Sequence, residues 1–148
     1  MKYPMPLILL FVCVCFVTQG QEYKGDIFRV VEEMPRMYGC EHIEDKEALE
    51  ECAQKTLMDF VYDNMEYPYE AEREGVEGMS VVQFTVEVDG NISDISVVRS
   101  LRYGIDEEAE YIVSLMQDQE TKYWRPGYED GEAVRVRFTL PIKFKLDQ

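Results

Sequence analysis

The stretch "AVRVRFTLPIKFKL", residues 133–146, decides the fold of this chain. Its even positions are apolar from Val134 to Leu146, whereas its odd positions from residue 135 onward carry arginine, threonine, proline and lysine. A period of two residues places successive side chains on opposite faces, so it predicts a β-strand that is buried on one face. Pro141 lies inside this strand, and proline is confined to edge strands, strand starts and bulges because it cannot donate a ladder hydrogen bond. We therefore expect an edge strand.

The clearest local unit upstream is a β-hairpin. The segments at residues 79–88 and 91–100 are both rich in β-branched residues, and "DG" at Asp89-Gly90 lies between them. Asp-Gly between two such runs is a strong hairpin signal, because both central positions of the usual tight turn need positive φ.

Two helices are predicted around this hairpin. Apolar residues recur at spacings of three and four after Asp45, which is a suitable N-cap, and again within residues 105–119. The first helix should end before Pro68, because the residue that precedes a proline avoids the α region. The order helix, strand, strand, helix, strand predicts an α+β fold. We expect a small antiparallel three-stranded sheet in the order 2-1-3, with helices packed on one face.

The N-terminus has the pattern of an export signal. Lys2 precedes the apolar run "LILLFVCVCFV" at residues 7–17, and small residues follow at Thr18 and Gly20. This arrangement predicts a secretory signal peptide over residues 1–20. The alternative is an inner-membrane anchor formed by residues 7–17, although the run is short for a helix that crosses a bilayer.

Two cysteines, Cys40 and Cys52, follow the predicted signal peptide. In an oxidising compartment such a pair most simply forms one disulfide. The alternative is a metal site that also uses His42 and a neighbouring acid, but it lacks the paired C-x-x-C spacing of strong zinc sites. We therefore expect the disulfide and neither a metal nor another cofactor.

Composition and motifs restrict the function. The formal net charge of −15 repels nucleic acid phosphates and anionic lipids, so we expect no nucleic acid partner. The chain has one histidine, His42, and its serines lie in no nucleophile motif. The segment "DGNISD" at residues 89–94 lacks the ligand series of a calcium loop, and a hairpin turn explains it better. We do not expect an enzyme.

The last strand carries basic side chains on its outward face in this acidic chain: Arg135, Arg137, Lys143 and Lys145. Charged side chains and a proline protect a sheet edge against aggregation, which is one explanation. The other is that a peptide segment of a partner adds to the edge as a further strand. Both explanations can hold together.

The order and spacing of several short motifs resemble the C-terminal domain of the TonB energy-transducer family. The matching positions are Tyr67-Pro68, Ala71, Gly75, Gly78, Asp89-Gly90, Trp124, Pro126-Gly127, Gly131 and Leu140-Pro141. They lie within residues 67–146, just over half of the chain. With this resemblance the chain divides into a signal peptide at 1–20, an N-terminal extension with disulfide and helix at 21–66, and a TonB C-terminal-like domain at 67–148.

The resemblance implies a protein of the periplasm of a Gram-negative bacterium. Members of this family pass energy from an inner-membrane proton-driven complex to outer-membrane transporters, and their C-terminal domain binds the TonB-box peptide of the transporter by strand addition. The implied partners are that peptide and the inner-membrane complex, and the edge strand is also open to a second copy of the chain. The implied peptide-binding residues are Tyr67, Pro68, Val134, Arg135, Val136, Arg137, Phe138, Thr139, Leu140, Pro141 and Lys143.

Two departures from a full transducer leave an alternative function open. The sequence has no convincing long membrane anchor and no Pro-rich spacer of the kind that would cross the periplasm. With a cleaved signal peptide the protein would bind a transporter without pulling on it. The alternative is a stand-alone exported module that regulates or supports other envelope proteins and transduces no energy.

Overall fold

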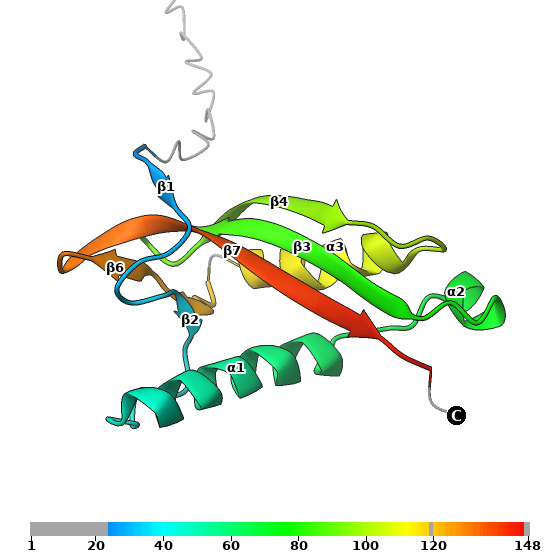
Figure 1. The fold of residues 1–148 in the computed structure, drawn as a ribbon, viewed down its shortest axis with the longest axis horizontal. Coiled ribbons are helices and arrows are strands. Elements are labelled where there is room, and N and C mark those ends of the chain that lie inside the picture. The colour runs from blue at the N-terminus through cyan, green and yellow to red at the C-terminus, as the bar shows by residue number, and fades with distance from the viewer. Residues whose placement is uncertain (1–23, 119, 147–148) are drawn as a thin grey trace, which may run out of the picture.

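A twisted β-sheet with two helices on one face makes up the computed structural model, which describes residues 24–118 and 120–146 (Figure 1). The predicted signal peptide lies outside these described residues. The middle strand β3 (Gly78–Val86) pairs antiparallel with β4 (Ile92–Arg99) and with β7 (Glu132–Phe144). β3 therefore lies between β4 and β7.

The sheet is mixed, so the prediction of a purely antiparallel three-stranded sheet is wrong, although the α+β class is confirmed. β1 (Ile27–Phe28) pairs parallel with β7, and β6 (Gly127–Glu129) pairs antiparallel with it. A separate pair joins β2 (Arg36–Met37) to β5 (Trp124–Arg125). Strands of two or three residues are too short to show a period in the sequence, which is why the pattern of side chains did not reveal them.

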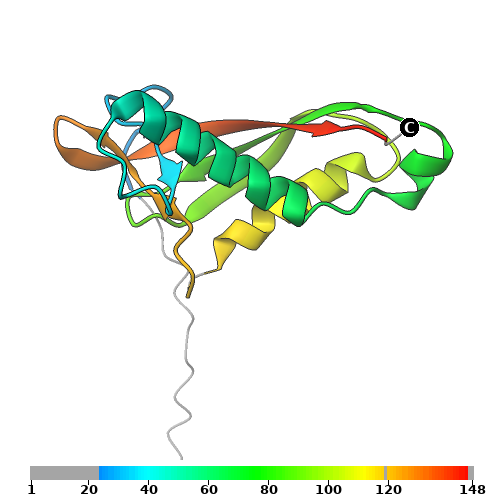
Figure 2. The same cartoon turned by 90° about the horizontal axis from the view of Figure 1, so that it is seen from below.

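The helices begin close to where the sequence places them. α1 (Lys46–Asp63) follows its N-cap Asp45, whose carboxylate accepts a hydrogen bond of 2.9 Å from the Ala48 amide. α2 (Tyr69–Arg73) starts directly after Pro68, and α3 (Ile105–Ser114) continues as the 3₁₀ turn η1 (Leu115–Gln117). Figure 2 shows α1 and α3 side by side on the same face of the sheet.

The core lies between that face and the two helices. Its sheet side consists of the apolar residues of β3 and β7, which alternate as the period of two predicts: Val82, Phe84, Val86, Val136, Leu140, Ile142 and Phe144 are all buried. Leu57 and Val61 of α1 and Ile112 of α3 pack against them. Because α1 packs into this core, the described part of the extension, residues 24–66, adds to the domain that follows, and the boundary at residue 67 stays a prediction.

The hairpin turn differs from the expected tight turn. The loop is closed by a hydrogen bond of 2.8 Å from the Glu87 amide to the Asn91 carbonyl, and only Gly90, at φ +83°, has positive φ in the Asp-Gly pair. A Cβ atom on Gly90 would lie 2.2 Å from the Trp124 carbonyl oxygen. The glycine is therefore required both by the backbone conformation and by the close approach of Trp124.

Asp106 fastens the first turn of α3 to the sheet. Its carboxylate accepts hydrogen bonds of 2.8 Å from the Leu101 amide and from the Ser80 hydroxyl, and a further one from Ser100. Burial raises the pKa of Asp106, but these hydrogen bonds outweigh burial and hold the pKa below its ordinary value. The ionised carboxylate therefore stabilises the fold.

We expect Asp106→Asn to lower the free energy of unfolding at pH 7 by about 1 kcal/mol, since the lost hydrogen bonds are charge-assisted but partly open to solvent. Because the folded pKa is depressed, this contribution is present above the usual aspartate pKa of about 3.9 and is lost as the pH falls through the lower folded value. Urea unfolding of both proteins at pH 7, 5 and 3 measures the difference. Glu110→Gln, on the exposed side of α3, is the control. A difference that stays constant down to pH 3 would contradict the assignment.

Candidate functional site

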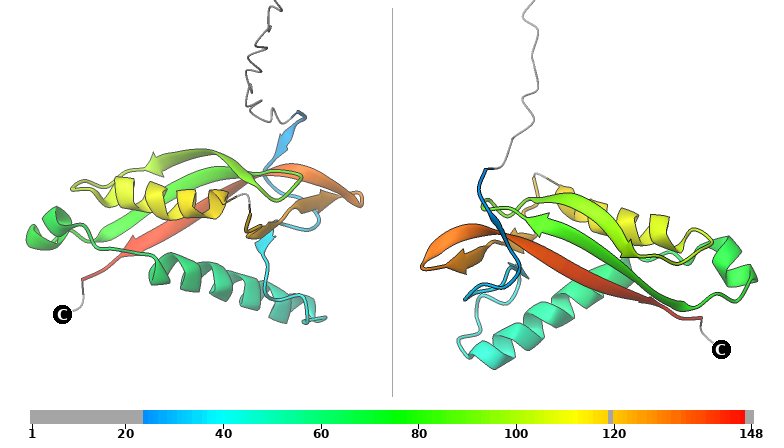
Figure 3. Two further views of the ribbon diagram at one scale, coloured as in Figure 1. Left: turned by 180° about the vertical axis from the view of Figure 1, so that it is seen from behind. Right: turned by 45° about the horizontal axis from the view of Figure 1, so that its top comes forward.

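The two halves of β7 differ in their backbone partners. β6 pairs with Glu132, Ala133 and Val134, and β1 pairs with Arg135 and Val136. β3 pairs with β7 from Val136 to Phe144, on the side opposite β1. On the side away from β3, residues 137–144 have no strand partner within the part of the chain that the structure describes (Figure 3). We call this stretch the open edge. The expectation of an edge strand is thus confirmed for residues 137–144 and wrong at Arg135 and Val136, where β1 covers the outer side.

A groove runs along the open edge. Its volume is about 880 Å³, and its walls are residues 138–141 of β7, residues 31–37 of the N-terminal extension, and the side of α1 that bears Leu49, Ala53 and Leu57. We call it the α1 groove. Trp124 also lines it, and its ring contacts those of Phe84 and Phe138 at centroid distances of 5.4 and 5.0 Å. The uncovered backbone of β7 therefore borders a largely apolar cavity.

Tyr67 and Pro68, which the family resemblance implies in peptide binding, lie at the far end of the open edge. The Tyr67 ring packs edge-on against Phe144, with centroids 5.8 Å apart, and its hydroxyl donates a hydrogen bond of 2.5 Å to the Val76 carbonyl. Burial raises the pKa of Tyr67, and the charges of Glu77 and Glu72 raise it further. The phenol is therefore a neutral donor that holds the end of β7 against the segment before β3.

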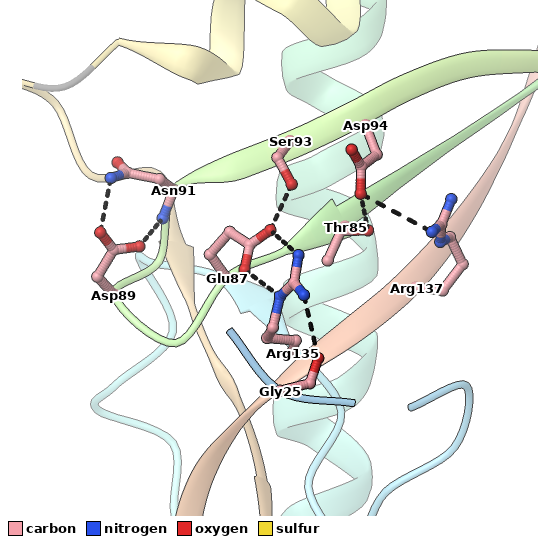
Figure 4. Close-up of polar contacts among 9 residues, drawn as sticks. All are labelled: Gly25, Thr85, Glu87, Asp89, Asn91, Ser93, Asp94, Arg135 and Arg137. Carbon is pink, nitrogen blue, oxygen red and sulfur yellow. Dashed lines mark hydrogen bonds and ion pairs between the residues drawn. The ribbon is translucent and has the colours of Figure 1, made fainter. Parts of the chain in front are cut away.

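The basic residues implied in peptide binding have different surroundings, which Figure 4 shows for Arg135 and Arg137. The Arg135 side chain is mostly buried and forms a bidentate ion pair with Glu87, with N–O distances of 2.7 and 3.0 Å. It also donates a hydrogen bond of 3.1 Å to the Gly25 carbonyl. Arg137 lies 3.9 Å from Asp94 in a looser pair. Lys143 is exposed. Of the three, Arg137 and Lys143 lie on the open edge, whereas Arg135 secures the N-terminal segment to the sheet.

Glu87 was not singled out in the sequence, yet its side chain is fully buried. It also accepts a hydrogen bond from the Ser93 hydroxyl. Two opposite charges that the fold brings side by side are the sequence signal for such a pair, but the signal is usable only once the strand register is known. The α1 groove was missed as well, although the spacing of Leu49, Ala53 and Leu57 marks one face of α1.

The predicted disulfide joins Cys40 and Cys52 and is confirmed. It ties the segment that follows β2 to the middle of α1, so it connects two walls of the α1 groove. The alternative of a thiolate metal site is excluded because each sulfur is bonded to the other.

The structure is a small α+β domain in which one strand of the sheet has an open edge. The sequence profile of the family described as "Gram-negative bacterial TonB protein C-terminal" matches residues 63–146. That range is more than half of the chain, and the chain belongs to this family.

Solved structures of TonB C-terminal domains are similar to this chain. A solution structure of the Helicobacter pylori domain is 23% identical and covers 64% of this chain and 95% of its own length, with a TM-score of 0.49. The Pseudomonas aeruginosa domain is 28% identical and covers 57% of this chain and 80% of its own length, with a TM-score of 0.41. No curated protein matches the chain.

Among the helices in residues 24–118 and 120–146, none combines the length and the apolar composition that spanning a bilayer requires.

Removing one partner of the buried ion pair should be costly. We expect Glu87→Ala to lower the free energy of unfolding by about 3–5 kcal/mol, because it leaves the Arg135 guanidinium buried without its carboxylate. The double variant Glu87→Ala with Arg135→Ala should lose less than the sum of the two single losses. Denaturant unfolding of the four proteins measures the coupling. Strictly additive losses would contradict the pair.

The disulfide should stabilise the protein by restricting the unfolded chain. We expect the variant with Cys40→Ser and Cys52→Ser to be less stable by about 2–4 kcal/mol, as for other short loops. Thermal unfolding with and without a reductant measures this, since reductant should lower the melting temperature of the unaltered protein and leave that of the double variant unchanged. If reductant also lowered the melting temperature of the double variant, the effect on the unaltered protein could not be assigned to the Cys40–Cys52 bond.

Proposed function

We propose that this protein binds an extended peptide segment of a partner by adding it as a strand to the open edge, residues 137–144. The observation that carries the proposal is the unequal pairing of β7: β1 covers its outer side at Arg135 and Val136, whereas residues 137–144 pair with β3 alone. An edge strand presents unpaired N–H and C=O groups, and backbone groups that leave water need hydrogen-bond partners. Strand addition supplies them, and flanking side chains then give selectivity.

The partner that membership of the TonB C-terminal family supports is the TonB-box peptide of an outer-membrane transporter. The protein would then work in the periplasm of a Gram-negative bacterium, in transport that is powered by the inner-membrane proton-driven complex. The family description and the position of the open edge support this proposal together.

The peptide-binding residues divide by their place on β7. Arg137, Phe138, Thr139, Leu140, Pro141 and Lys143 lie on the open edge and would accept the added strand. Tyr67 and Pro68 would flank one end of it, where Tyr67 contacts Phe144. A role for Val134, Arg135 and Val136 stays a prediction, and it would require β6 or β1 to be displaced.

Titration of the ¹⁵N-labelled protein with TonB-box peptides tests the proposal. We expect amide signals of residues 137–144 to shift, because the added strand forms hydrogen bonds along that edge. The outer strand β4 is the internal control, since its free side lies at the opposite edge of the sheet. Shifts confined to β4, or no shifts with a panel of such peptides, would overturn the proposal. A dependence of the same signals on protein concentration alone would show instead that a second copy occupies the edge.

A further inference from the structure

We infer that the α1 groove selects the side chains of the bound segment: two apolar residues at alternate positions, next to a basic residue. This inference rests on the proposed strand addition and deepens it, because it states which peptides the open edge accepts and which part of the chain makes the choice.

First, the open edge and the α1 groove share part of β7. Residues 138–141 belong to the open edge and also line the α1 groove. Side chains of neighbouring strands in a sheet point to the same faces in register, so every second side chain of an added strand would point as Phe138 and Leu140 do, toward the helices. Those side chains would enter the space between β7 and α1.

The second step is the chemistry of that space. The wall opposite β7 has an apolar part, which includes Met34, Met37, Leu49, Ala53 and Leu57. Ala53 leaves room where a larger residue would fill the groove, and methionine adapts its shape to different side chains. The volume of about 880 Å³ is enough for more than one side chain. Since a polar residue would lose its hydration there, the entering side chains are apolar.

The third step is the charge at the rim. Four glutamates line the groove, and two of them are paired: Glu33 lies 2.8 Å from Arg125, and Glu50 lies 4.0 Å from Lys46. Glu32 and Glu44 are exposed and lie in no ion pair within residues 24–118 and 120–146. Arg36 also lines the groove, but these two carboxylates outnumber it, and in a chain with a net charge of −15 they attract a lysine or arginine that flanks the apolar pair.

The residues that would make this choice precede the family match. The groove-lining part of the extension and of α1 ends at Met58, whereas the match covers residues 63–146. The family domain supplies the backbone edge, and the extension supplies the opposite wall, which the Cys40–Cys52 bond holds in place. The extension would therefore decide which partner binds.

Groove-filling variants test the apolar part. The probes are acetylated nonapeptides that contain Val-Thr-Val-Thr-Lys, and matched peptides with both valines replaced by glycine. Ala53→Leu should weaken binding of the valine peptide about tenfold and leave binding of the glycine peptide unchanged.

A second variant and a control accompany it. Leu49→Ala, which removes part of the apolar wall without adding bulk, should also weaken binding of the valine peptide. Ala48→Leu, exposed on the same helix, should bind as the unaltered protein does. Thermal unfolding of each variant checks that it is folded. If Ala53→Leu does not fold, binding of the valine peptide by Leu49→Ala tests the inference instead.

Charge reversal tests the basic residue. Replacing the peptide lysine by glutamate should weaken binding about tenfold at low salt, and the variant with Glu32→Lys and Glu44→Lys should reverse that preference. Glu47→Lys with Glu51→Lys, on α1 but outside the groove, should keep it.

The outcomes separate the two proposals. If no peptide shifts the amides of residues 137–144, strand addition fails. If peptides bind there with equal affinity whatever their side chains, and all variants behave alike, strand addition stands and the selection by the α1 groove is wrong.

Discussion

The pairing of the β7 backbone is the constraint on which the rest of this structure depends. At its start β7 pairs with β6 and then with β1, and from residue 137 onward it pairs with β3 alone. The buried pair of Glu87 and Arg135 keeps the first half closed, because Arg135 also donates to the Gly25 carbonyl just before β1. A partner segment therefore has one stretch of this strand available, and β1 marks where that stretch begins.

The N-terminal extension contributes more than a connection to the domain. α1 packs into the common core through Leu57 and Val61, and Leu49 and Ala53, nearer its N-terminus, line the groove. One helix thus stabilises the sheet at one end and leaves space beside it at the other. This arrangement places an apolar wall opposite an unpaired backbone, which is the combination that recognition by strand addition requires.

Much of the framework was predictable from local patterns in the sequence. The period of two in β7, the N-cap Asp45 and the cysteine pair each carry their signal within a few residues, and the structure contains all three features. The features that were missed depend on contacts between distant segments. β1 has only two residues and cannot show a period, and the pair of Glu87 and Arg135 depends on the register between strands. The groove was missed for the same reason, since its walls come from three separate parts of the chain.

The Cys40–Cys52 bond has a consequence for where the groove can work. Thiols stay reduced in the cytosol and pair in oxidising compartments. A newly made chain in a reducing environment would carry the same helix and the same strand, but the covalent link between the two groove walls would be missing. The N-terminal wall of the groove would then be freer to move relative to α1. Binding a peptide would therefore cost more conformational entropy of the protein. On the proposed binding mode, oxidation after synthesis would fix the two groove walls to each other and so sharpen the choice of partner.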